Sequence, residues 1–422
     1  MRTLLGYFLA INVLTFEVTS LPQMSSNVQM VEKFTPKNSN GKYNSDVDLS
    51  TVSAIAFVNL SVYLFIINAI YFVPDMIRND GYNAEAHVIS TEDGYLLTLH
   101  RIPGRFESPP VLLQHGFLGS SADWVLAGPK KGLAYILADH GYDVWLGNFR
   151  GNTYSRAHKT LPTSDSRFWN FSWHEIGIYD LPAEISYITN IKKSNLTYIG
   201  HSMGTTSFYV MSSMRPDIAT SVKIMFSLAP VAYMSHLKSP VRLLFIAHYL
   251  GEDEFLPQNI LIKFLAKYGC DIYNIEHKLC ANILFAVCGF DNSQLNDTLV
   301  PRIMGHCPAG GSTKSAVHYT QEIISGKFRQ FDYGPRENLK IYHNVEPPNY
   351  NISAISVPIA LYYADNDWLS SVTDVRHLAK ELKTLVDLYE IPYSKFNHLD
   401  FMWAVQAPEL VYRRLLRALE GS

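Results

Sequence analysis

The stretch that decides the fold reads Leu196-Thr197-Tyr198-Ile199-Gly200-His201-Ser202-Met203-Gly204. Its first four residues form a short, mostly apolar run that is typical of a buried strand. The next five match Gly-x-Ser-x-Gly, in which two glycines let the backbone turn sharply from a strand into a helix. A helical pattern over residues 205–214 follows and stops before Pro216. The stretch therefore predicts that Ser202 lies on a tight strand-to-helix turn, with its hydroxyl exposed above the edge of a sheet.

Short apolar strands alternate with helical patterns on both sides of this turn. Residues 86–90 and 95–101 flank Glu92-Asp93-Gly94, which is typical of a hairpin turn. The other expected strands are 110–114, 142–146, 358–363 and 385–390, and the other expected helices are 130–140, 176–191, 372–382 and 408–419. Strands separated by helices indicate an α/β fold with a mostly parallel central sheet flanked by crossover helices.

One long segment interrupts this alternation. Residues 233–356 are richer in helix signals and contain all four cysteines. We interpret this segment as a mainly helical cap, or lid, that is inserted between two parts of the α/β core. Those two parts are residues 74–232 and residues 357–422.

The composition is that of a globular chain with a large core, because 47% of the 422 residues are hydrophobic and 17% are charged. The formal net charge is -3 and no dense run of Lys and Arg occurs, so we expect no nucleic-acid partner. No Cys-x-x-Cys pair occurs, which argues against a structural zinc site. The sequence implies neither a metal nor an organic cofactor.

The N-terminus predicts a signal peptide. Arg2 precedes a mostly apolar run over residues 4–16, and the small side chains of Val18 and Ser20 permit cleavage after Ser20. Residues 1–20 are therefore expected to direct the chain into an oxidising compartment, where disulfides form. Residues 21–50 are polar and are expected to form a linker.

A second apolar segment, residues 51–73, contains a run over 54–73 that is long enough to span a bilayer. Asn59 and Asn68 interrupt this run, and polar groups at membrane depth are costly. Three interpretations stay open: a membrane anchor, the true signal sequence, or an amphipathic surface helix. An anchor whose N-terminal side faces the cytosol would leave the rest of the chain in the lumen.

A serine hydroxyl is a weak nucleophile that requires a base, and the base requires a carboxylate to orient it. On a Gly-x-Ser-x-Gly turn these residues follow in the order serine, acid, histidine. Asp367 comes after the expected strand 358–363, although Asp365 and Asp374 lie close enough to be alternatives. His398 follows in a loop after the last expected strand. We therefore predict that Ser202 is the nucleophile, His398 the base and Asp367 the acid.

The tetrahedral intermediate of such a reaction carries an oxyanion, which requires hydrogen-bond donors already in place. The backbone N–H of Met203, directly after the nucleophile, is expected to be one donor. The other is expected to be the N–H of Phe117, because Gly116 lets the backbone approach closely.

The chain resembles the acid lipases, the α/β-hydrolase-associated family of gastric lipase, lysosomal acid lipase and their invertebrate relatives. The resemblance runs from about residue 74 to near the C-terminus. The motifs that carry it, in order, are Thr91-Glu92-Asp93-Gly94-Tyr95, Arg101-Ile102-Pro103, Gln114-His115-Gly116, Gly147-Asn148-Phe149-Arg150-Gly151-Asn152, Phe168-Trp169-Asn170-Phe171-Ser172, Gly177-Ile178-Tyr179-Asp180-Leu181-Pro182, Pro308-Ala309-Gly310, Ser325-Gly326-Lys327-Phe328 and Asn397-His398-Leu399-Asp400-Phe401.

This resemblance implies an α/β-hydrolase fold and a serine carboxylic ester hydrolase that acts on triglycerides or sterol esters beneath a lid. It places Ser202, Asp367 and His398 in the triad and selects Asp367 over Asp365. Two positions depart from the family pattern. Met203 stands where the family usually has Gln, which affects the expected substrate preference, and Phe149 replaces a small residue, which would narrow the pocket.

The resemblance also implies a disulfide between Cys270 and Cys280. Cys288 resembles an additional cysteine of the family and Cys307 is extra, so that a Cys288–Cys307 pair stays open. Asn-x-Ser/Thr sequons permit glycosylation but do not establish it. They occur at Asn59, Asn170, Asn195, Asn296 and Asn351, of which Asn170 and Asn296 are the better candidates.

The expected partner is a lipid ester at the surface of a micelle, droplet or membrane, and the expected location is secreted or lysosomal. Two other functions are compatible with the residues. An acyltransferase would pass the acyl group to an alcohol in place of water, and a lipid-binding protein would not use the triad at all.

Overall fold

The computed structural model describes residues 72–240, 254–255, 287–291 and 293–421. The predicted signal peptide, the linker, nearly all of the second apolar segment, Asn59, Cys270 and Cys280 lie outside the described residues. Among the helices that are described, none combines the length and the apolar character needed to cross a bilayer.

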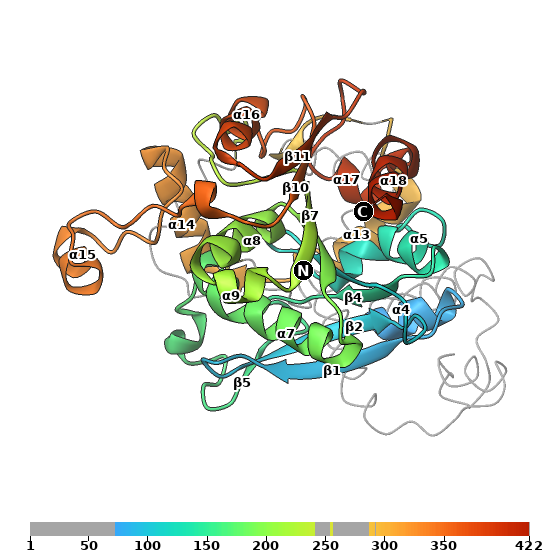
Figure 1. Cartoon of the computed structure of the whole chain (residues 1–422), viewed down its shortest axis with the longest axis horizontal. Coiled ribbons are helices and arrows are strands. Elements are labelled where there is room, and N and C mark those ends of the chain that lie inside the picture. The colour runs from blue at the N-terminus through green and yellow to red at the C-terminus, as the bar shows by residue number, and fades with distance from the viewer. Residues whose placement is uncertain (1–71, 241–253, 256–286, 292, 422) are drawn as a thin grey trace, which may run out of the picture. The chain divides into compact units, whose positions relative to one another are not determined.

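The described core is built on a nine-stranded sheet with the order β1-β2-β4-β3-β6-β7-β10-β11, in which β5 also pairs with β2. Strand β2 pairs antiparallel with β1, β4 and β5. The remaining neighbours, β4–β3, β3–β6, β6–β7, β7–β10 and β10–β11, are all parallel. Figure 1 shows the sheet running from β1 near the bottom to β11 near the top. The strands are β1 (Glu85–Ser90), β2 (Tyr95–Ile102), β3 (Pro110–Gln114), β4 (Asp143–Leu146), β5 (Ala157–His158), β6 (Leu196–His201), β7 (Val222–Leu228), β10 (Ile359–Tyr363) and β11 (Leu385–Glu390).

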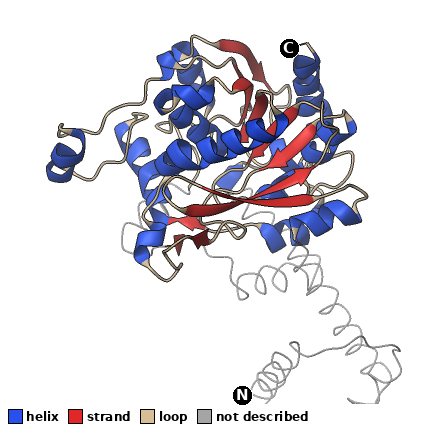
Figure 2. Cartoon of the chain, turned by 60° about the horizontal axis from the view of Figure 1, so that its bottom comes forward, coloured by secondary structure: helices blue, strands red, loops and turns tan. Residues whose placement is uncertain are grey.

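Two hydrophobic cores form because successive side chains of a strand point to opposite faces of the sheet. On β3, Leu112 packs into one core, while Val111 and Leu113 pack into the other. Each fully buried aliphatic side chain of this kind contributes about 1.5–3 kcal/mol of transfer free energy. Helices cover both faces of the sheet (Figure 2), as the α/β class requires.

The helices of the core are α4 (Val73–Asn79), α5 (Leu133–Asp139), α6 (Trp173–Glu175), α7 (Leu181–Lys192), α8 (Met203–Met214), α9 (Pro216–Ala219), α16 (Val372–Glu381), α17 (Asp400–Trp403) and α18 (Arg413–Glu420). Wide π-helical turns, η4 (Ile176–Asp180) and η8 (Pro408–Tyr412), lead into α7 and α18. Side chains of α7 and α8 pack into the core that contains Leu112, whereas those of α5 and α18 pack into the other core.

The described part of the cap contains β8 (Glu254–Phe255), α13 (Val300–His306), β9 (Gly311–Ser312), α14 (Thr313–Ser325) and α15 (Pro335–Tyr342). Helix α14 starts at Ser312, whose side chain accepts a hydrogen bond from the amide of Lys314, and ends at Gly326, which has a φ of 66°. His318 of α14 stacks on the indole of Trp173 with ring centroids 3.6 Å apart, which attaches the cap to the core. Helix α15 projects from the body at the left of Figure 1.

Most expected strands and helices are confirmed, with shifts of a few residues at their ends. The central strand β7 (Val222–Leu228) was not predicted from the sequence. Lys223 and Ser227 interrupt its apolar run, which hid the strand pattern, but Lys223 is exposed and Ser227 is buried with its hydroxyl 2.6 Å from that of Tyr209. The helix expected over 130–140 begins only at Leu133, because Lys130 adopts a left-handed conformation with a φ of 66°.

The two cysteines that the structure describes are free thiols, so the Cys288–Cys307 pairing is not formed. The Cys307 thiol instead points to the backbone carbonyl oxygen of Leu118 at 3.7 Å. Burial raises the pKa of both thiols well above the ordinary value, which opposes formation of a reactive thiolate.

Candidate active site

Ser202 lies on a strained turn between β6 and α8. Its φ of 53° and ψ of -118° are unusual for a residue with a side chain and cost about 1–3 kcal/mol. The amide of Ser202 donates to the carbonyl oxygen of Leu228 on β7 at 3.1 Å, which holds the turn in place. A Cβ atom built on Gly204 would lie 2.5 Å from the carbonyl oxygen of Gln114, so only glycine permits this close packing against β3.

His398 and Asp367 meet in the loops that follow β11 and β10. Nδ1 of His398 lies 2.8 Å from Oδ2 and 3.0 Å from Oδ1 of Asp367, and both side chains are buried. The amides of Leu369 and Ser370 donate to Oδ1 of Asp367 at 2.9 and 2.7 Å. These hydrogen bonds fix the carboxylate and leave Nε2 of His398 free of the acid, as a general base requires.

The two alternative acids are placed elsewhere. Asp365 is exposed. Asp374 accepts hydrogen bonds from the amide of His236 at 2.9 Å and contacts Nδ1 of the same histidine at 2.7 Å. The geometry therefore favours Asp367 as the partner of His398.

The loop after β3 passes directly beside Ser202. A Cβ atom built on Gly116 would lie 3.0 Å from Cβ of Ser202 and 3.5 Å from its Oγ. The next amide along the chain belongs to Phe117. On the other side, Met203 is the first residue of α8, where unpaired amides and the helix dipole favour negative charge. The two amides predicted to bind the oxyanion belong to Phe117 and Met203. They directly follow Gly116 and Ser202, which lie next to each other.

His115 fixes the peptide unit between Gly116 and Phe117. Nε2 of His115 accepts the amide of Phe149 at 3.1 Å, so Nδ1 carries the proton and donates to the carbonyl oxygen of Gly116 at 2.7 Å. Burial lowers the pKa of His115 to about 4, which keeps the ring neutral. Because the peptide bond is trans, anchoring the Gly116 carbonyl makes the N–H of Phe117 point in the opposite direction.

The buried side chain of Arg150 stabilises the segment that contacts the loop after β3. Arg150 is fully buried and pairs with Asp93 at 2.6 Å and with Asp180 at 2.6 Å, while its guanidinium lies 3.9 Å from the ring centroid of Tyr95. These contacts fix the backbone of Phe149, whose amide binds His115. The Arg150 motif therefore has a structural role that reaches the oxyanion loop.

His201, the residue before Ser202, was not singled out from the sequence. Its Nε2 lies 2.9 Å from the backbone carbonyl oxygen of His398, and the two rings are 4.8 Å apart. Burial lowers the pKa of His201 to about 3, so the neutral ring donates this hydrogen bond. The only signal in the sequence was its place inside the Gly-x-Ser-x-Gly motif.

Comparison with known proteins decides the family. A family model described as a partial alpha/beta-hydrolase lipase region matches residues 73–128, and one described as the alpha/beta hydrolase fold matches residues 109–248. The chain is 42% identical to Lipase 1 of Drosophila melanogaster, over 83% of this chain and 81% of the relative. It is 42% identical to gastric triacylglycerol lipase of Bos taurus and 39% identical to lysosomal acid lipase/cholesteryl ester hydrolase of Homo sapiens, each over 82% of this chain and 90% of the relative. The chain belongs to the acid lipase family.

The two positions that depart from the acid lipase pattern are both buried. Met203 is 4% exposed and packs into the core that contains Leu112. The ring of Phe149 packs against that of His115, with centroids 4.8 Å apart. The structure therefore explains Phe149 as packing beneath the oxyanion loop.

The sequons of this acid lipase that the structure describes lie at or near the surface. Asn170, Asn195 and Asn351 are exposed, and Asn296 is half-buried, with its side chain capping a short helical turn by accepting the amide of Thr298. Within the described ranges, no group of three or more His, Cys, Asp or Glu side chains is arranged to hold a metal ion.

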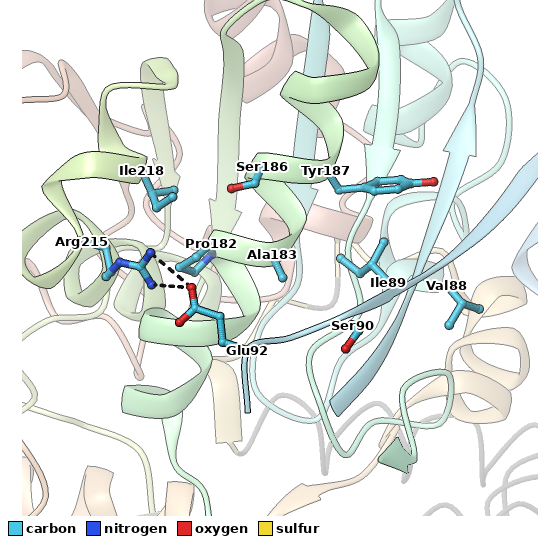
Figure 3. Close-up of a pocket in the computed structure, with 10 residues that line it drawn as sticks. All are labelled: Val88, Ile89, Ser90, Glu92, Pro182, Ala183, Ser186, Tyr187, Arg215 and Ile218. Carbon is cyan, nitrogen blue, oxygen red and sulfur yellow. Dashed lines mark hydrogen bonds and ion pairs between the residues drawn. The ribbon is translucent and has the colours of Figure 1, made fainter. Parts of the chain in front are cut away.

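A groove of about 450 Å³ lies away from the triad, between β1 and α7 (Figure 3). Val88, Ile89, Pro182 and Ile218 give it apolar walls, and the ion pair between Glu92 and Arg215 closes one end at 3.5 Å. None of its lining residues belongs to the triad or to the oxyanion loop.

Proposed function

We propose that this acid lipase hydrolyses the carboxylic ester bonds of neutral lipids, triglycerides or sterol esters, through Ser202, His398 and Asp367. The observation that supports this most directly is the pairing of His398 with Asp367 at 2.8 Å. The strained turn that presents Ser202 contacts this pair through the preceding residue, because Nε2 of His201 lies 2.9 Å from the backbone carbonyl oxygen of His398. The names of the relatives, gastric triacylglycerol lipase and lysosomal acid lipase/cholesteryl ester hydrolase, support the same substrate class.

The reaction proceeds in two halves. His398 takes the proton of the Ser202 hydroxyl as its Oγ attacks the ester carbonyl, and a tetrahedral oxyanion forms. His398 then gives this proton to the leaving alcohol, and the acyl group stays on Ser202. Water, deprotonated by His398, attacks the acyl-enzyme in the same way and releases the fatty acid.

Each half-reaction places negative charge on the former carbonyl oxygen. The N–H groups of Met203 and Phe117 receive this oxyanion, and His115 keeps the second donor in position by anchoring the Gly116 carbonyl at 2.7 Å. Asp367 stabilises the imidazolium form of His398 that arises in both halves.

The described part of the cap contacts the oxyanion loop and would shape the acyl site. Tyr319 of α14 lies edge-on to Phe117 with ring centroids 6.3 Å apart. The amide of Ala309 donates to the carbonyl oxygen of Leu118 at 2.7 Å. These contacts bring cap residues against the oxyanion loop, where they would exclude water and line the site for an acyl chain.

The same proposal includes a secreted or lysosomal location. The family's named relatives support it, and the predicted signal peptide, a Cys270–Cys280 disulfide and glycans on Asn170, Asn195, Asn296 or Asn351 would accompany it. Enzymatic removal of N-glycans from the secreted chain would lower its apparent mass. An unchanged mass would argue against this location.

The test is the release of fatty acid from triolein and from cholesteryl oleate by the full chain, at acidic and at neutral pH, beside Ser202→Ala. We expect hydrolysis of at least one lipid by the wild type and none by the variant. A folded wild type as inactive as the variant on both lipids and on a short soluble ester would point to a lipid-binding protein. Acyl transfer would be recognised by ester products when a long-chain alcohol is supplied.

A further inference from the structure

The short segment 288–291, called the strap below, crosses the two loops that carry Asp367 and His398. The carbonyl oxygen of Cys288 accepts the backbone N–H of His398 at 3.3 Å and that of Trp368 at 3.4 Å. One carbonyl group thus contacts the base itself and the residue next to the acid. The strap therefore joins two loops that follow different strands.

Two side-chain amides bind the next two carbonyl groups of the strap. Nδ2 of Asn397 donates to the carbonyl oxygen of Gly289 at 3.0 Å. Nδ2 of Asn366 donates to the carbonyl oxygen of Phe290 at 3.1 Å and to that of Lys395 at 2.7 Å. Because Asn366 precedes Asp367 and Asn397 precedes His398, the strap is bound to the residue directly before each member of the pair.

Gly289 is the point of closest approach. Its φ of 111° is one that side chains oppose, and a Cβ atom built on it would lie 2.1 Å from the carbonyl oxygen of Asn366 and 3.2 Å from Cβ of Asn397. Any other residue would push the strap away from the acid loop. The other face of that loop is also held, since the carbonyl oxygen of Trp368 accepts the amides of Lys238 and Ser239 at 3.0 and 3.1 Å.

We propose that the strap is a positioning element of the catalytic pair, in which Gly289, Asn366 and Asn397 set the distance between Asp367 and His398. These residues do not touch the substrate and act through the triad, so the inference rests on the proposed function. Its physical basis is that acid and base sit on separate loops and that a displacement of about 1 Å lowers the rate roughly 100-fold.

The first test is Gly289→Ala in the full chain. We expect kcat on a short soluble ester to fall roughly 100-fold with KM little changed, because the ester site is intact while the pair is displaced. The rate constant for labelling of Ser202 by a fluorophosphonate should fall in parallel, and the final extent of labelling counts the folded sites. A soluble ester removes any effect of binding to a lipid surface.

Gly334→Ala is the matched control. Gly334 also lies in the cap and has a φ of 85°, but a Cβ atom built on it meets nothing within 4 Å. The control therefore also places a side chain at a positive φ but without the collision, and we expect its kcat per labelled site to equal that of the wild type.

Asn366→Ala provides a second test. It removes atoms and so creates no collision, and it can be measured even if Gly289→Ala fails to fold. It removes the side-chain amide of Asn366, which joins the loop that carries Asp367 to the strap at Phe290 and to the loop before His398 at Lys395. We expect kcat to fall roughly 10-fold, the equivalent of about one lost hydrogen bond. Wild-type kcat and labelling rate per folded site in Asn366→Ala, and in Gly289→Ala where it folds, would overturn the proposal.

Ser202→Ala in the same assay distinguishes a failure of the proposed triad from a failure of the proposed role of the strap. If it abolishes activity while the strap variants behave as the wild type, the triad stands and the role of the strap is wrong. If Ser202→Ala retains activity, the proposed triad is wrong and the strap loses its basis with it.

Discussion

Nε2 of His201 lies 2.9 Å from the backbone carbonyl oxygen of His398, so the residue before the proposed nucleophile holds the backbone of the proposed base. Replacing His201 by Phe keeps an aromatic ring but removes this donor and leaves a buried carbonyl group unpaired, at a cost of about 1–3 kcal/mol. We expect His201→Phe to lower kcat roughly 10-fold on a soluble ester, measured per active site.

His201→Gln is the comparison for this prediction, because its side-chain amide can still donate. It should retain more of the activity than His201→Phe. Equal, wild-type activity in both variants would show that the contact has no part in catalysis.

Asp367 is the acid that contacts His398, and the exposed Asp365 two residues earlier provides a control of the same chemistry. Asp367→Asn should lower kcat roughly 10³–10⁴-fold, because an amide cannot stabilise the imidazolium and favours the wrong tautomer of the base. Asp365→Asn should leave kcat unchanged. Steady-state kinetics of the two variants decide the point, and a larger loss in Asp365→Asn would reverse the assignment of the acid.

His115 anchors the Gly116 carbonyl at 2.7 Å and so orients the amide of Phe117. We expect His115→Phe to lower kcat roughly 100-fold with a small change in KM, since removal of one oxyanion donor costs about that much. His140→Phe is a suitable control, because His140 is exposed and its ring contacts the carbonyl oxygen of Ile136 in the helix that precedes it. Wild-type kcat in His115→Phe would mean that Phe117 is held by other contacts.

Asp400 makes the free energy of unfolding depend on pH. Burial, followed by the nearby carboxylates of Asp291 and Asp367, raises its pKa to about 8 from an ordinary value of 3.8. The folded state therefore binds more protons than the unfolded state between about pH 4 and pH 8, so this group's contribution to stability is lost as the pH rises through that range. In Asp400→Asn, which cannot ionise, the stability relative to the wild type should increase from pH 5 to pH 8.

Urea unfolding at the two pH values measures this difference. Asp297→Asn, at an exposed carboxyl group, is the control and should show no such trend. A difference between Asp400→Asn and the wild type that stays constant with pH would refute the linkage.

The elements that were predictable from the sequence are those with local signals. The apolar strand 196–199 and the glycines around Ser202 placed the nucleophile, and the order of Asp367 and His398 after later strands placed them in loops that meet. Strand β7 (Val222–Leu228) was missed because Lys223 and Ser227 interrupt its apolar run, whereas its place in the sheet depends on pairing with its neighbours β6 and β10.

The residues that position the site could not be predicted, because their contacts join distant parts of the chain. His201 meets the backbone of His398, and Gly289 meets Asn366, through pairings that no local pattern encodes. Spacing alone also left the choice between Asp365 and Asp367 open, and the resemblance to the family was needed to select Asp367.

The acid and base loops follow β10 and β11, the last two strands of the sheet. A ribosome that makes this chain therefore adds Ser202 long before it adds either Asp367 or His398. The growing polypeptide carries the proposed nucleophile without its partners, so the proposed triad can assemble only after synthesis is nearly complete and the final strands have joined the sheet.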